Sequence, residues 1–176
     1  GTVKCFGEDI TGVQPYRIAR KSIAYTPQEQ TLFQDLTVEE NLRLALTSDE
    51  LMKPGLERIG AFFPFVPQRL KQRAGTLSGG EQKMLLVARA LMTKPKLMLV
   101  DEISEGLQPS VIERLAGVFK AEREQSQTAI LLIEQHVKFA LVVADRYAVL
   151  KLGEIVDRGD ANHDGAHVRI ASQLSV

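Results

Sequence analysis

The segment from Leu77 to Glu102 constrains the fold of this chain more than any other. Ser78 is followed three residues later by Glu81, which is the pattern of a capping box that opens a helix. Pro95 ends the predicted helix, and the apolar run Leu97–Val100 that follows has the length of a buried strand. The segment therefore predicts one helix–strand unit of an α/β domain. The apolar face of the helix consists of Met84, Leu85, Ala88, Leu91 and Met92.

The start of this predicted helix and the end of the strand both carry groups suited to phosphate chemistry. Ser78, Gly79 and Gly80 leave backbone N–H groups bare at a helix N-terminus, where the helix dipole favours a phosphate. The strand ends in two adjacent carboxylates, Asp101 and Glu102. Periodicity alone is equally consistent with an ordinary helix–strand unit, so the residues themselves must decide.

The string Leu-Ser-Gly-Gly-Glu-Gln, followed by an apolar strand ending in Asp-Glu, resembles the signature motif and the Walker B motif of an ABC-type ATPase. Further motifs occur in the matching order, and the chain is most similar to the ATPase subunits of branched-chain amino-acid and amide importers. The resemblance implies an α/β P-loop NTPase (ABC ATPase) core with an inserted α-helical subdomain. The resemblance implies four regions. Residues 1–28 form the first part of the α/β core, up to the Q-loop, and residues 29–77 form the helical subdomain. Residues 78–160 form the rest of the α/β core, and residues 161–176 form a C-terminal tail.

The resemblance also implies roles for the residues that follow the strands. Gln28 follows the predicted strand Ser22–Thr26 and matches the Q-loop glutamine, near the nucleotide and the metal. Asp101 is the implied Mg²⁺ partner, and Glu102 is the implied general base for ATP hydrolysis. His136 follows a second apolar strand and matches the switch histidine, a donor toward the γ-phosphate, although a histidine beyond a strand is usually structural or solvated.

In the family resembled, two subunits sandwich two ATP molecules, so the expected cofactors are ATP and Mg²⁺. The expected partners are a second ABC ATPase subunit, transmembrane permease subunits and, indirectly, a solute-binding protein. The expected location is the cytoplasmic face of the cell membrane. The signature residues implied at the partner's ATP are Ser78, Gly79, Gly80 and Glu81, and those implied at the dimer interface are Ser104, Gly106 and Leu107.

The phosphate-binding loop of the family, Gly-x-x-x-x-Gly-Lys-Ser/Thr, has no counterpart in the 176 residues, which contain no Gly-Lys pair. We therefore expect an N-terminally truncated core that binds ATP weakly or not at all. An alternative function is a non-hydrolysing ABC module that offers its signature motif to a partner's ATP or acts as an interaction or regulatory domain. The family also places a strand between 129–133 and 146–150. We expect unpaired edges there, unless these strands pair directly or another chain fills the position.

Composition disfavours other classes of protein. The 22 basic and 22 acidic residues cancel, so charge does not indicate nucleic acid, and an ABC ATPase acting on DNA or ribosomes is disfavoured. No apolar run approaches the roughly 18 residues of a membrane-spanning helix. The start of the sequence lacks the pattern of a signal peptide. A single cysteine, Cys5, suits a reducing compartment.

Two further clusters allow two interpretations each. The aromatic, proline-broken segment Phe62–Pro67 is predicted to form the core of the helical subdomain, and the alternative is an exposed patch that receives a membrane subunit. His163 and His167 are spaced i, i+4 with Asp164 between them, as in some metal sites. Gly165 weakens the helix that this spacing needs, so we expect no metal site there.

Overall fold

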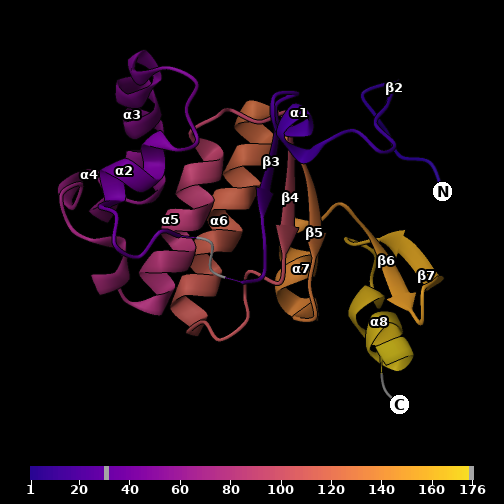
Figure 1. Ribbon diagram of the computed structural model, residues 1–176. Coiled ribbons are helices and arrows are strands. Elements are labelled where there is room, and N and C mark those ends of the chain that lie inside the picture. Colours follow the sequence, from indigo (N-terminus) through magenta and orange to yellow (C-terminus); the bar gives the residue numbers. More distant parts are fainter. Residues whose placement is uncertain (30–31, 175–176) are drawn as a thin grey trace.

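The computed structural model describes residues 1–29 and 32–174 and places a parallel sheet at the centre of the molecule (Figure 1). Strand β4 lies between β3 and β5, and all three run in the same direction. The register pairs Thr26 with Val100 and Asp101 with Ile133, so the strands end at one edge of the sheet. This confirms the predicted α/β class. The strands are β3 (Ile23–Thr26), β4 (Leu97–Asp101) and β5 (Ala129–Ile133).

Two long helices cover one face of this sheet. They are α5 (Gly79–Leu91) and α6 (Pro109–Ser126), which lie side by side next to the strands in Figure 1. Met98 and Val100 on β4 are buried in the core that these helices share. Successive strand residues face opposite sides, so Leu131 and its register partner Leu99 lie on the other face. There Leu131 is 57% exposed, which shows that the described residues leave this face largely open.

A group of short helices lies on the far side of α5 from the sheet (Figure 1). Within it, the aromatic, proline-broken segment Phe62–Pro67 supplies Phe63 and Val66, both fully buried, while Phe62 and Phe65 pack partly against the same core. The prediction that this segment forms core is confirmed. The elements of the group are α2 (Val38–Arg43), α3 (Met52–Phe62), α4 (Phe65–Gln68) and the 3₁₀ turns η1 (Asp49–Leu51) and η2 (Ala74–Thr76).

In the sequence, Thr37 followed three residues later by Glu40 is a second capping-box pattern, and it predicts a helix that continues through Leu42, Ala45 and Leu46. This helix begins as expected but ends early. Thr37 and Glu40 form the predicted capping box at the start of α2. The sequence pattern extends the helix through Ala45 and Leu46, whereas α2 ends at Arg43. Beyond it, the Ala45 and Leu46 backbone N–H groups bond three residues back, which tightens the chain into a 3₁₀-type turn.

A buried ion pair joins this helical group to the α/β part. Arg58 on α3 donates to both carboxylate oxygens of Glu122 on α6, at 2.5 and 2.6 Å. The Glu122 side chain is 1% exposed and also accepts a hydrogen bond from the Thr128 hydroxyl. Removal of one partner from such a pair leaves an unpaired buried charge, so the pair constrains how α3 sits on α6.

Two hairpins lie near the ends of the chain. The turn at Phe6 and Gly7, both with positive φ, joins β1 (Lys4–Cys5) to β2 (Glu8–Asp9) and precedes α1 (Pro15–Ala19). The second hairpin pairs β6 with β7, and it lies with α8 at the side of the sheet away from the helical group (Figure 1). The C-terminal elements are α7 (Val137–Val143), β6 (Arg146–Lys151), β7 (Glu154–Asp160) and α8 (Ala166–Leu174).

The sheet edges near 129–133 and 146–150 are unpaired, as expected from the sequence. In the described part of the chain, β5 pairs with β4 alone and β6 pairs with β7 alone. Direct pairing between β5 and β6, one of the alternatives, does not occur. Among the described residues no group of three His, Cys, Asp or Glu side chains could hold a metal. No described helix combines the length and apolar character that crossing a bilayer requires.

Candidate functional site

The start of α5 is held by the capping box that the sequence predicts. The Glu81 carboxylate accepts hydrogen bonds from the Ser78 backbone N–H at 3.0 Å and from its hydroxyl at 2.9 Å. The Ser78 hydroxyl in turn accepts from the Glu81 N–H at 3.3 Å. Arg69 donates to the other Glu81 oxygen at 2.8 Å. The bond from the Ser78 backbone N–H is the main cause that lowers the pKa of Glu81. Together, the Ser78 and Glu81 side chains hold the first turn of α5.

The two glycines in the first turn of α5 differ in what surrounds them. A Cβ on Gly80 would lie 3.2 Å from Val111 Cγ2 on α6, so helix packing explains this glycine. A Cβ on Gly79 would meet nothing within 4 Å, and Gly79 is exposed. Packing within the described residues therefore does not require glycine at position 79. The feature is consistent with close approach of another molecule to the backbone there.

Three loops meet at the carboxyl end of the sheet around the Glu102 side chain. Gln28 Nε2 donates to Glu102 Oε2 at 2.7 Å and to Glu105 Oε2 at 3.1 Å. Gln135 Nε2 donates to Glu102 Oε1 at 2.7 Å. The parallel register explains the meeting, because Glu102 comes directly after β4, while Gln28 and Gln135 come two residues after β3 and β5. Both oxygens of the predicted general base are thus oriented by amides from neighbouring loops.

The backbone of Glu102 is also fixed. Its φ is 44°, in the left-handed region that non-glycine residues rarely adopt, and its N–H donates to the Ile133 carbonyl at 2.9 Å. Strained residues of this kind are retained where the surroundings fix them, often at functional sites.

Asp101 lies half-buried at the end of β4, and its carboxylate is suited to a cation. Within the described residues its side chain accepts a hydrogen bond from the Tyr25 hydroxyl, at a long 3.4 Å. Partial desolvation raises the pKa of Tyr25, and the negative charge of Asp101 adds to that shift. Proteins commonly hold Mg²⁺ through one or two carboxylates together with phosphate oxygens and water. Asp101 fits such a role.

His136 occupies the loop after β5 but is not in contact with the Glu102 cluster. It is exposed, it precedes the first residue of α7, and its ring stacks near Phe139 with centroids 6.4 Å apart. The structure thus brings Gln28, Asp101 and Glu102 to one edge, with His136 next in sequence to Gln135. Its predicted role as a donor toward the γ-phosphate stays a prediction.

The loop after Glu102 is held by a residue that the sequence analysis did not identify. Glu134 accepts from the Ser104 N–H at 3.0 Å and from its hydroxyl at 2.7 Å, and Ser104 is buried. Leu107 is half-buried and packs on the core, whereas Gly106 is exposed with a φ of 71°. Ser104 therefore supports the loop from within, and Gly106 is the residue of this predicted interface most open to a partner.

Sequence reasoning also missed Gln135 and Glu105, which bond to Glu102 and to Gln28 respectively. Both are polar residues in loops, adjacent to residues that a motif does identify, and nothing in the local sequence separates them from solvated side chains. Their position became visible only through the register of the sheet. The register of neighbouring parallel strands is the signal that could have found them.

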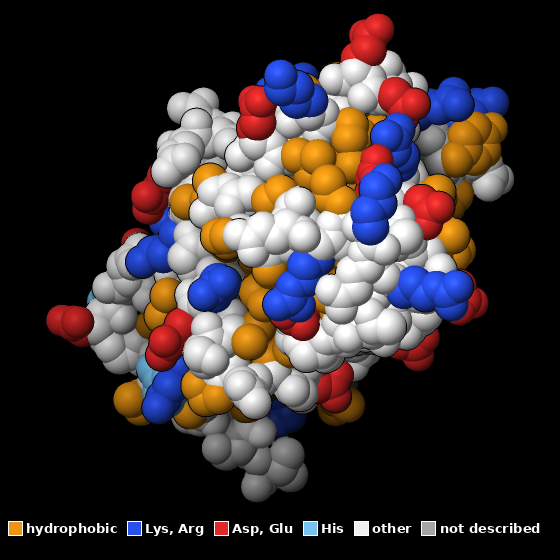
Figure 2. Space-filling view, turned by 90° about the vertical axis from the view of Figure 1, so that its left-hand side faces the viewer, with side chains coloured by type: hydrophobic (Ala, Val, Ile, Leu, Met, Phe, Trp, Pro, Cys, Tyr) orange, Lys and Arg blue, Asp and Glu red, His pale blue; other side chains and the backbone are white. Residues whose placement is uncertain are grey.

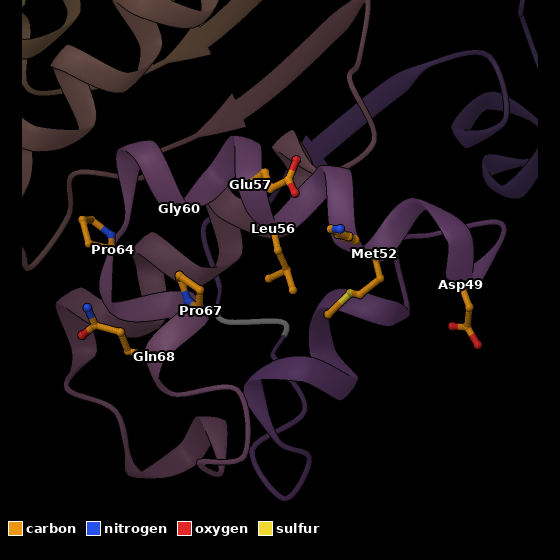
Figure 3. Close-up of a pocket in the computed structure, with 9 residues that line it drawn as sticks. Asp49, Met52, Leu56, Glu57, Gly60, Pro64, Pro67 and Gln68 are labelled. Carbon is orange, nitrogen blue, oxygen red and sulfur yellow. The ribbon is translucent and has the colours of Figure 1, made fainter.

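The helical group carries a surface hollow of about 610 Å³ between α3 and α4. Figure 3 shows Leu56 and Met52 projecting from α3 beside Pro67 on α4, with Asp49 and Glu57 at the margins. Figure 2 shows the face that includes the helical group, where hydrophobic side chains are interspersed with charged ones of both signs. Apolar surface of this kind, edged by charge, is typical of a protein interaction site.

Comparison with known proteins gives consistent matches over most of the chain. The family model described as "ABC transporter" matches residues 1–105. The high-affinity branched-chain amino acid transport ATP-binding protein BraG of Pseudomonas aeruginosa is 41% identical, over 97% of this chain and 75% of its own length. The probable branched-chain amino acid transport ATP-binding protein LivF of Archaeoglobus fulgidus is 36% identical, over 92% of this chain and 70% of its own length.

Solved structures share the fold. The ADP conformation of MJ1267, an ATP-binding cassette of an ABC transporter, has a TM-score of 0.75 at 24% identity, and the match covers 95% of this chain and 71% of that one. A dimeric post-hydrolysis state of the cassette MJ0796, bound to ADP and Pi, has a TM-score of 0.76 at 19% identity, with 93% and 74% covered. These likenesses confirm the predicted P-loop ATPase fold.

Proposed function

The chain belongs to the ABC transporter family of ATP-binding proteins, and from this membership we propose that it serves as the ATP-hydrolysing subunit of an importer. The observation that carries the proposal is the arrangement at Glu102. Two amides orient its carboxylate at the mouth of β4, beside an Asp101 carboxylate that is open to a cation. Hydrolysis of a phosphoanhydride needs such a base, with a positioned water and a metal to offset phosphate charge.

In the proposed mechanism the residues of this chain act on water and on charge. Glu102 takes the proton from the attacking water, and Gln28 and Gln135 hold its carboxylate in the orientation for that transfer. Asp101, with Gln28, would hold Mg²⁺, which supplies positive charge against the phosphates when bound. His136 would donate toward the γ-phosphate once the loop after β5 approaches the nucleotide.

The start of α5 would contact the ATP of a second ABC ATPase subunit. Ser78 and Glu81 fix the helix terminus, and the exposed Gly79 lets the backbone N–H groups approach phosphate. Gly106 and Leu107 would lie at the same interface, next to Ser104, which supports that loop. Two subunits would then enclose two ATP molecules.

The transported solute is proposed from the relatives. BraG and LivF are described as branched-chain amino acid transport proteins, and this chain shares 41% and 36% of its residues with them over the matched lengths. We assign the same solute class, branched-chain amino acids or related amides. Transmembrane permease subunits would dock at the helical group, whose hollow between α3 and α4 has an apolar lining. That contact would hold the protein on the cytoplasmic face of the membrane, with the solute-binding protein on the other side.

A glutamate substitution in the full-length protein tests the catalytic proposal. Glu102→Gln keeps the shape of the side chain and removes the base, so we expect ATP turnover to fall by about 10²–10⁴-fold while nucleotide binding is retained. Glu113→Gln, on the exposed side of α6, is the matched control and should hydrolyse ATP normally. Phosphate release and nucleotide binding are measured on the same preparations.

Two results would separate the alternatives. Unchanged turnover in Glu102→Gln would reject the assigned base. If the unmodified full-length protein hydrolyses no ATP but increases the turnover of a partner ATPase, the non-hydrolysing module that offers only its signature motif would be the better description.

A further inference from the structure

Lys83 is a buried charged residue that the proposed mechanism does not use. It lies on α5, five residues after Ser78, and is 8% exposed. Its ammonium group donates a hydrogen bond to the backbone carbonyl of Gln28 at 2.9 Å. The bond thus connects the helix that begins with the signature residues to the residue whose side chain contacts Glu102.

The burial of Lys83 is unusual enough to require a reason. It is the one lysine or arginine among the buried residues of the described part of the chain. The salt bridges found among the described residues join other side chains, so its bond to a neutral carbonyl is not an ion pair. Burial of an ammonium group is costly unless its hydrogen bonds are well placed. A neutral polar side chain could fill the site at a lower cost, which suggests that the reach and charge of lysine matter there.

The geometry gives this contact a consequence at the site. Gln28 is exposed and follows β3 by two residues, so its position depends on what holds the loop. Its side-chain Nε2 donates to the Glu102 carboxylate at 2.7 Å and to the Glu105 carboxylate at 3.1 Å. Lys83 fixes the backbone of that residue from a rigid helix, and the capping box of Ser78 and Glu81 fixes the start of the same helix two to five residues away.

We propose that Lys83 is a positioning residue: it ties the signature helix α5 to the backbone of Gln28 and thereby sets the orientation of Glu102. The inference rests on the proposed function, because Gln28 and Glu102 are assigned to hydrolysis there. A shift of the start of α5, on contact with a partner's ATP, would pass through Lys83 to the base of its own chain. The chain's two predicted nucleotide contacts would therefore be linked by one hydrogen bond.

The test compares kinetic constants in the full-length protein. Lys83→Met keeps the apolar stem and removes the ammonium group, so we expect kcat for ATP to fall about tenfold as the base loses its orientation. KM should change by less than about threefold, since Lys83 does not contact ATP. Lys120→Met, on the exposed side of α6, is the matched control and should leave both constants unchanged.

A double-mutant cycle with Gln28→Ala separates positioning from general stabilisation. Gln28→Ala keeps the backbone carbonyl that Lys83 binds. It removes the side-chain amide whose position the Lys83 bond is proposed to set. In the Gln28→Ala protein, the added substitution Lys83→Met should then lower kcat by no more than about twofold. Full additivity, or a fall in melting temperature without a change in kcat, would overturn the proposal.

Hydrogen exchange tests the tether independently of hydrolysis. In Lys83→Met, the amides of Tyr25–Glu29 should exchange faster than in the unmodified protein, and in Lys120→Met they should not. Equal exchange in all three would show that Lys83 does not hold the loop, whatever the ATPase result. Faster exchange in a protein that hydrolyses no ATP would support the tether and count against the proposed function instead.

Discussion

At the scale of single residues, Gly79 and Gly80 show how adjacent identical residues can have different causes. Gly80 packs closely against α6, whose Val111 would lie 3.2 Å from an added Cβ and would have to shift by a few tenths of an ångström. Gly79 has open space in the same direction. A glycine at an exposed helix start is less stable than alanine there, and no contact within the described residues offsets the difference. The proposed contact with a partner's ATP supplies a reason.

Alanine substitutions distinguish these two glycines. We expect Gly79→Ala to leave the unfolding free energy unchanged or raise it by up to about 1 kcal/mol. We expect Gly80→Ala to lower it by about 1–3 kcal/mol, because the methyl group overpacks against Val111. Chemical denaturation measures both. In the full-length protein, Gly79→Arg should also block ATP-dependent dimer formation, whereas Gly117→Arg, at an open glycine on α6, should not. A normal dimer with Gly79→Arg would remove the signature motif from the interface.

At the scale of elements, the helices begin where their capping boxes place them. Thr37 with Glu40 and Ser78 with Glu81 each satisfy two N–H groups that a helix start leaves unpaired. In both boxes the glutamate accepts from a backbone N–H, and this bond is the main cause that lowers the pKa of each carboxyl group. The stability of the first turn is therefore linked to pH.

The direction of that linkage gives a prediction for Glu81. Because folding lowers its pKa, the carboxylate stabilises the folded protein above the ordinary pKa of a glutamate. This contribution is lost as the pH falls through the lower pKa of the folded state. Glu81→Gln should therefore destabilise the protein near neutral pH and have little effect in acid, below the folded pKa. Urea denaturation at a series of pH values measures the difference. An equal loss at every pH would mean that the charge on Glu81 contributes nothing.

At the scale of the whole molecule, the described residues cover the sheet on one face and leave the other largely open. Helices α5 and α6 bury Met98 and Val100, while on the other face Tyr25, Leu131 and Ile133 are each more than half exposed. The edge of β5 away from β4 also has no strand beside it in the described residues. An apolar face next to an open strand edge favours association with another chain.

We therefore expect the 176 residues, expressed alone, to self-associate. Leu131→Lys places a charge on the open face without touching the buried one, so it should lower the apparent mass in light scattering at equal concentration. Val142→Lys, at another exposed apolar residue but on α7, is the control and should have less effect. A monomeric 176-residue chain with an unchanged mass in Leu131→Lys would show that this face is not adhesive.

Most of the helices and strands could be predicted from the sequence because their causes are local. The capping boxes, the proline that ends the signature helix and the alternation of short apolar runs all act within a few residues. The early end of α2 was missed because the chain beyond Arg43 continues in a tighter turn with the same apolar spacing. Local pattern does not distinguish a 3₁₀ turn from one more turn of α-helix.

By itself, the sequence determined the family, the fold class and the residues that carry a motif, since these depend on which side chains occur and in what order. Only the tertiary structure decided which side chains meet. Gln135 reaches Glu102, Glu134 holds Ser104 and Lys83 binds the carbonyl of Gln28 because parallel register and helix packing bring distant segments to one edge. Contacts between segments so far apart in the chain depend on the relative placement of whole elements, which no local pattern encodes.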